Sequence, residues 1–206
     1  MKLILSKIKT YFGKLDKLLL FMCMGIAFFA VFIQYTLYEN DISSAVTASQ
    51  YKTQIIAFIA GIVIAMALAA INYKYLAKLW FIYVPLAMGL TLLLFTPLGI
   101  QREGADDIGW LDLGIMTIQP SEILKLAFIL SLAVHLSKVE DRMNEPIHFI
   151  LLCIHGAVPT LLIRQTGDDG SALVFLFIFI CMMFAAGLSW KYLVMIAVAI
   201  PPAVFF

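Results

Sequence analysis

Residues 18–38 read LLLFMCMGIAFFAVFIQYTLY, a stretch without a single charged side chain. A helix that crosses the hydrocarbon core of a bilayer needs about 20 mostly apolar residues. The basic segment before it, residues 1–17, resembles the start of a signal peptide, but the apolar run is too long for an h-region and lacks a convincing A-x-A cleavage site. We therefore predict that residues 18–38 form a retained transmembrane helix and that residues 1–17 form a cytoplasmic basic N-terminal segment.

The composition of the whole chain points the same way. Of its 206 residues, 63% are hydrophobic and 13% are charged, whereas average soluble domains have about 45–50% apolar and about 25% charged residues. This excludes an ordinary soluble fold and a disordered chain. A net charge of +1 provides no basic surface of the kind that nucleic-acid binding requires, so no nucleic-acid partner is expected. The three cysteines, Cys23, Cys153 and Cys181, lie in apolar runs, where packing is the expected role.

Six further apolar segments follow the first one. They lie at residues 54–71, 79–98, 121–136, 147–163, 171–188 and 192–206. We predict an all-α, polytopic transmembrane bundle with about seven spans, in which residues 18–206 form one domain. The fourth segment is short, and the apolar stretch Leu113–Ile118 before it could lengthen it. The seventh stops at Phe206 without a polar flank, so we expect the chain to be the N-terminal part of a longer protein, truncated at its C-terminus.

The distribution of lysine and arginine predicts the orientation. Positive residues are retained on the cytoplasmic side of a membrane. With the N-terminus inside, the cytoplasmic side carries ten of the 14 basic residues, namely Lys2, Lys7, Lys9, Lys14, Lys17, Lys74, Lys78, Lys138, Arg142 and Lys191. We therefore predict a cytoplasmic N-terminus, with the loops near residues 99–119 and 164–170 at the outer face.

The first of these outer loops leads into the sequence QPSEILK, residues 119–125. Pro120 suits the first turn of a helix, which makes Gln119 the N-cap. Glu122 can then reach back to the cap and face the positive end of the helix dipole, and Lys125 lies on the same face, where the two can pair. A capping role explains these residues, but ionisable groups at the entrance of a span also suggest function.

The second outer loop reads RQTGDDGSA, residues 164–172. A tight glycine-bearing turn followed by a helix cap explains it. Asp168 and Asp169, together with Glu122, could alternatively hold a divalent cation through oxygen ligands. Trp110, in the first loop, can anchor at the lipid headgroups or stack on a sugar.

The remaining candidate ligands are three histidines at membrane depth. His135, His148 and His155 are isolated in the sequence, and single histidines on apolar helices are more often packing residues than metal ligands. We therefore predict no metal site at these residues.

Three motifs in order resemble the SEDS family, which comprises RodA, FtsW and SpoVE. They are GA…WLDLG at residues 104–114, QPSE…K at residues 119–125 and Q…D…GSA at residues 165–172. In the family these correspond to a G-A-x-R-W-x-x-x-G loop, a Q-P-S-E-L-x-K helix start and a Q-P-D-L-G-T-A turn. The chain departs from them in having Gly109 where an arginine usually precedes the tryptophan, in its additional acids Asp106 and Asp107, and in a third motif without proline.

This resemblance implies a peptidoglycan glycosyltransferase in the bacterial cytoplasmic membrane. Such an enzyme polymerises lipid II at the outer face and typically works with a class B penicillin-binding protein, the transpeptidase. A sugar hydroxyl attacks the anomeric carbon of the growing chain while the lipid pyrophosphate leaves; a carboxylate base and nearby cations would assist. The resemblance places the catalytic aspartate beyond residue 206, and assigns roles in shaping the site or binding substrate to Trp110, Gln119, Glu122, Lys125 and Asp168. It gives no metal ligand, and a divalent cation stays an open alternative.

Two other functions remain open at this point. A transporter or flippase for the same lipid would use intramembrane polar residues as part of a pathway, although their expected place at the outer edge favours the transferase. A non-catalytic membrane scaffold is the second alternative.

Overall fold

The computed structural model describes residues 16–40, 48–102, 104–114, 117–192, 194–196 and 198. The chain divides into two compact units, Met1–Tyr73 and Lys74–Phe206. The basic segment at residues 1–17 and the seventh predicted span at residues 192–206 lie almost entirely outside the described residues; those described after residue 189 are helical.

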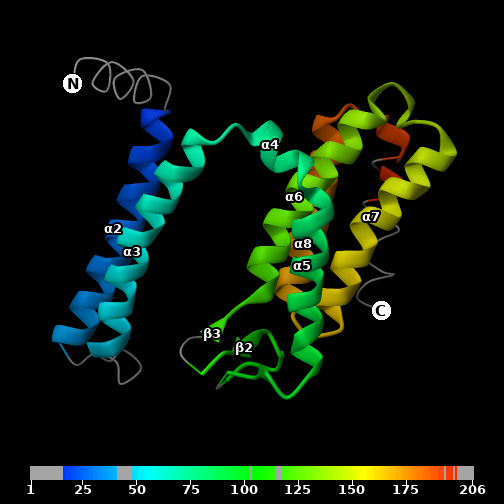
Figure 1. Cartoon of the computed structure of the whole chain (residues 1–206). Helices are drawn as coiled ribbons and strands as arrows, with labels where there is room; N and C mark the ends of the chain where they lie inside the picture. The colour runs from blue at the N-terminus through cyan, green and yellow to red at the C-terminus, as the bar shows by residue number, and fades with distance from the viewer. Residues whose placement is uncertain are drawn as a thin grey trace, which may run out of the picture. The chain divides into compact units, whose positions relative to one another are not determined.

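The first unit contains two long helices that lie side by side, α2 (Lys17–Glu39) and α3 (Ala48–Ala70) (Figure 1). Asp16 caps α2, because its Oδ1 accepts a hydrogen bond from the Leu19 N–H at 3.0 Å. At the other end of the pair, the ring of Tyr38 stacks on that of Tyr51 with 6.2 Å between the centroids. The first predicted span is thus confirmed as a helix, extended by one residue at each end.

The second unit is a helical bundle. Its helices are α4 (Tyr73–Lys78, beginning one residue before the unit), α5 (Trp80–Leu92), α6 (Pro120–Lys138), α7 (Pro146–Arg164) and α8 (Asp169–Ala185), with short 3₁₀ turns η1 (Leu93–Phe95) and η2 (Glu140–Arg142). Large apolar side chains that are almost completely buried form the core between α6, α7 and α8, among them Leu132, Leu152, Phe175, Phe179 and Met183. The predicted all-α bundle is confirmed.

Four of the described helices are long and apolar enough to cross a membrane. They are α2, residues Gln50–Ala70 of α3, α6 and α7. Residues Trp80–Phe95 and helix α8 are apolar but shorter. Many apolar side chains on these helices are exposed, for example Phe21 at 75% and Leu126 at 66%; such surfaces suit contact with lipid or with further helices.

Between α5 and α6 the chain forms a small antiparallel sheet rather than more helix. Its strands are β1 (Gly99–Ile100), β2 (Trp110–Asp112) and β3 (Thr117–Ile118), in the order β1-β2-β3. The idea that Leu113–Ile118 lengthens the fourth span is therefore wrong. Gly114 adopts a positive φ of 77° and its N–H donates to Asp112 Oδ1 at 2.8 Å, which turns the chain back before a helix can start.

The sheet, the start of α6 and the turn between α7 and α8 lie at one end of the second unit (Figure 1). We call this end, formed by the described residues within 99–125 and 164–171, the sheet end. It holds both loops that the charge distribution predicts to lie outside the membrane.

Candidate functional site

The sheet positions Trp110 through backbone pairing. Trp110 pairs with Ile100 across β1 and β2, and the fully buried Leu111 next to it fixes the strand in the unit. The Arg102 guanidinium lies over the indole, with its carbon 3.4 Å from the ring centroid. This is a cation–π contact. Sequence reasoning missed Arg102, because only the strand register brings it back over a ring eight positions later.

The conformation of the same loop also affects position 109, where this chain has glycine and the SEDS motif has arginine. A Cβ at this buried position would collide with the Asp107 carboxylate, so a larger side chain would require the Asp107 side chain to move. The cation that the SEDS motif places directly before the tryptophan is absent here. Arg102, two residues after β1, instead supplies a positive charge at the indole.

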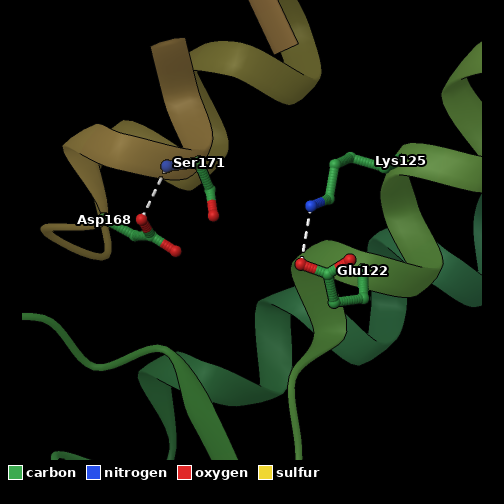
Figure 2. A network of polar contacts seen from close by, with 4 residues as sticks. All are labelled: Glu122, Lys125, Asp168 and Ser171. Atoms are coloured by element: carbon green, nitrogen blue, oxygen red, sulfur yellow. Dashed lines mark hydrogen bonds and ion pairs between the residues drawn. The ribbon is translucent and has the colours of Figure 1, made fainter. Parts of the chain in front are cut away.

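The start of α6 places the second set of predicted residues. Gln119 is the N-cap residue and Pro120 opens the helix, as predicted, but the Gln119 side chain makes no capping hydrogen bond. Glu122 pairs with Lys125 as predicted, with 2.6 Å between Oε1 and Nζ (Figure 2). The Lys125 side chain is 19% exposed and that of Glu122 is 59% exposed, so the pair lies at the edge of the unit and not in its core.

The start of α8 has the predicted turn and cap. Asp168 Oδ1 accepts a hydrogen bond from the Ser171 N–H at 2.7 Å (Figure 2). Asp169 forms an ion pair with Arg164, at 2.9 Å between Oδ1 and Nη1. Gly167 has a positive φ of 85°, a conformation that glycine adopts without strain.

The structure joins the two loops. The Ile108 N–H donates to the Thr166 carbonyl oxygen at 2.9 Å. A Cβ on Gly167 would lie 3.3 Å from the Asp107 Cα, so the two backbones are in close contact. The loop that carries Trp110 and the turn that carries Asp168 therefore belong to one site at the sheet end.

The alternative of a divalent cation at this site finds no support in the donor set. Within the described part of the chain, no group of three or more His, Cys, Asp or Glu side chains could hold a metal ion. The acids of the candidate set already have partners: Glu122 pairs with Lys125, Asp168 caps α8 and Asp169 pairs with Arg164.

A second polar cluster lies inside the bundle, and sequence reasoning missed it. His155 Nδ1 lies 3.1 Å from His135 Nδ1, and its Nε2 lies 3.0 Å from Ser131 Oγ. The spacing of Ser131 and His135 on one face of α6 is a visible signal, but nothing in the sequence shows that α7 brings His155 to them. His148 makes no hydrogen bond to this cluster among those found in the described residues, and it contacts Glu145 at 3.7 Å.

Comparison with known proteins agrees with these motifs. The family of cell cycle proteins that comprises FtsW, RodA and SpoVE matches residues 14–206. The chain is 27% identical to the peptidoglycan glycosyltransferase MrdB of Escherichia coli K12, over 96% of this chain and 52% of that protein. It is 37% identical to the probable peptidoglycan glycosyltransferase FtsW of a Geobacter species, over 57% of this chain and 33% of that protein. The matched region thus spans between about a third and about half of the length of these relatives.

Solved structures show the same fold. The rod shape determining protein RodA of Thermus thermophilus superposes with a TM-score of 0.61 at 26% identity, over 82% of this chain and 55% of that one. A chain from a peptidoglycan synthase complex that coordinates polymerization and crosslinking superposes with a TM-score of 0.69 at 24% identity, over 90% of this chain and 53% of that one.

These matches, together with four apolar helices of spanning length, identify a multi-pass membrane protein. The family match covers all the described elements, including the three motifs at the sheet end. The chain belongs to the FtsW, RodA and SpoVE family, known as the SEDS family.

Proposed function

We propose that this chain works in a peptidoglycan glycosyltransferase that polymerises lipid II at the outer face of the bacterial cytoplasmic membrane. Two relatives bear the name peptidoglycan glycosyltransferase. The observation that carries the proposal is the joined site at the sheet end, where the Ile108–Thr166 hydrogen bond connects the loop of Trp110 to the turn of Asp168. Because β2 also pairs with β3, which leads into α6, segments that match three family motifs lie together, and this favours a shared function over independent turns and helix caps.

The residues of this site suit a reaction in which a pyrophosphate leaves. Negative charge develops on the leaving group, and fixed cations stabilise it. Lys125 and Arg102 are the cations that we assign to this task, while Glu122 holds the Lys125 ammonium in place at 2.6 Å. Trp110 offers an aromatic face near the sheet end for a sugar ring. We expect the catalytic carboxylate to come from outside residues 1–206.

Asp168 has a different role in this proposal. Its carboxylate accepts from the Ser171 N–H and so fixes the first turn of α8 beside the joined loops. It acts as a positioning residue for the site. We also propose a class B penicillin-binding protein as partner, since the complex that contains a similar chain combines polymerization with crosslinking.

The test uses the full-length protein with its transpeptidase partner, reconstituted in proteoliposomes with lipid II. We expect Glu122→Ala and Asp168→Ala to impair glycan polymerisation while membrane insertion stays intact. Asp168→Asn keeps a capping oxygen and removes the charge, so recovery by this variant assigns the effect to positioning.

A matched control is available at the opposite end of the unit. Glu145 also precedes a basic partner by three residues, since it contacts His148 at 3.7 Å, and it lies outside the sheet end. Glu145→Ala should polymerise lipid II like the wild type. Wild-type polymerisation by both Glu122→Ala and Asp168→Ala would refute the proposal. Leaflet-to-leaflet transfer of lipid without polymerisation would indicate the flippase, and absence of both activities in the wild type would indicate the scaffold.

A further inference from the structure

Two neighbouring cavities lie between α5, α6 and α7. The larger extends along α6 from Leu124, in the second turn of this helix, to His135. The larger has a volume of about 480 Å³ and its walls are almost entirely apolar, with contributions from Val84, Met88, Leu124, Phe128, Leu151 and Val158. The smaller, of about 240 Å³, is lined by Trp80, Val134 and Lys138. Ser131, His135 and His155 line both cavities, so the two cavities are neighbours that share a polar wall.

The shared residues form a row of hydrogen bonds. Ser131 Oγ lies 3.0 Å from His155 Nε2, and His155 Nδ1 lies 3.1 Å from His135 Nδ1. A neutral imidazole has one donor and one acceptor nitrogen, so the row satisfies both nitrogens of His155 and one of His135. Among the described residues, no hydrogen bond occupies the second nitrogen of His135. This nitrogen belongs to a side chain that lines both cavities.

The polar end of this space carries a positive charge. Lys138 is the last residue of α6, and its Nζ lies 5.8 Å from the centroid of the Trp80 ring. Lysine and tryptophan are typical of the membrane–water interface, and the lysine distribution of the chain predicts that this interface is the cytoplasmic one. The acids Glu140 and Asp141 follow in η2, but neither lines the cavities.

We propose that α5, α6 and α7 form a binding site for an anionic phospholipid of the cytoplasmic leaflet. One acyl chain occupies the larger cavity, whose volume lies in the range of about 300–1,000 Å³ of small-molecule sites. The phosphate contacts Lys138 and the His135 nitrogen. Charge complementarity and the direction of the site support this occupant: the cationic end lies at the predicted cytoplasmic interface, where the headgroup is, and the apolar cavity extends from there along α6 as far as Leu124. None of the residues assigned to the proposed transferase site lines either cavity, although Leu124 of the larger cavity adjoins Lys125; the lipid site does not rest on the proposed function.

The experiment measures phosphatidylglycerol retained by the full-length protein. The protein is purified from nanodiscs that contain phosphatidylglycerol and phosphatidylcholine, and bound lipid is counted by native mass spectrometry. We expect the wild type to retain phosphatidylglycerol selectively. A lysine near an anionic lipid contributes about 1 kcal/mol, so Lys138→Ala should lower the apparent affinity about fivefold. Val158→Phe, which fills the apolar cavity, should reduce retention of both lipids.

Lys78→Ala is the matched control. Lys78 ends α4, lies on the same predicted side of the membrane and lines neither cavity, so its loss should leave retention unchanged. An equal effect of Lys78→Ala and Lys138→Ala would overturn the proposal, since it would indicate general attraction to the leaflet. Failure of the wild type to retain lipid would also overturn it, because other segments of the full-length protein would then fill the cavity. Thermal unfolding of each variant shows whether it is folded.

Discussion

Replacement of Gly156 by alanine tests how closely α7 and α8 must approach. Gly156 is buried on α7 and faces Phe179 of α8. A Cβ at this position would lie 2.7, 2.8 and 2.9 Å from three carbons of the Phe179 ring. The ring is 1% exposed, so it has no solvent-filled space into which it can move. The structure therefore requires glycine here for close packing.

The size of the expected destabilisation follows from the overlap between the added Cβ and the Phe179 ring. Contacts below 3.4 Å are tighter than ordinary van der Waals contact, so the ring or the helix must shift by at least 0.5–0.7 Å (3.4 minus 2.9, and 3.4 minus 2.7). Overpacking of a core by a methyl group costs about 1–3 kcal/mol. At an unobstructed helical site the same change is favourable by about 0.5–1 kcal/mol. Relative to such a site, Gly156→Ala should thus be destabilised by about 1.5–4 kcal/mol.

Gly89 provides the unobstructed site. It lies inside α5, and a Cβ there would meet no described atom within 4 Å. The free energies of unfolding of Gly156→Ala and Gly89→Ala would be compared in the full-length protein in the same detergent by denaturant titration. The double variant Gly156→Ala with Phe179→Leu should recover part of the loss, because the smaller side chain removes the collision. Equal stability of the two alanine variants would refute the packing argument.

Three further predictions concern the sheet end. Gly167→Ala should lower the free energy of unfolding by about 1 kcal/mol or more, because Gly167 has a φ of 85° that other residues adopt at a cost; an unchanged midpoint in denaturant titration would contradict this. Asp168→Ala should cost about 0.5–2 kcal/mol in the same measurement through loss of the cap, and Asp168→Asn much less. Arg102→Leu should increase acrylamide quenching of Trp110 fluorescence in a background where it is the sole tryptophan, since the guanidinium covers the indole at 3.4 Å; unchanged quenching would show that the contact does not persist in solution.

Much of the helical architecture could be predicted from the sequence, because a long apolar run marks the part of a helix that contacts lipid. The uncharged run at residues 18–38 ends at charged residues on both sides, and α2 spans Lys17–Glu39. Helix α3 begins at Ala48, six residues before the apolar run that predicts it. Polar residues such as Gln50 and Lys52 continue the helix beyond the hydrocarbon, so hydropathy marks the lipid-contacting part of a helix and not its end.

The candidate site was predictable only where its contacts are local. The Glu122–Lys125 pair and the Asp168 cap join residues three apart, and helical spacing dictates both. The contacts of Arg102 with Trp110, of Ile108 with Thr166 and of His135 with His155 join different segments. These depend on strand register and on helix packing, for which one sequence carries no direct signal.

Helix packing also determines where the sheet-end residues lie. Gly156 lets α7 pack closely against α8. This packing determines the position of the turn between the two helices at the end of the unit. The carbonyl of Thr166 in this turn then accepts from Ile108, and the strand that follows carries Trp110. A substitution in the middle of the bundle should therefore disturb the site through this path. For this reason, loss of activity in a sheet-end variant must be compared with the stability of the same variant, and the pair Asp168→Ala and Asp168→Asn allows this comparison because only the first loses the cap.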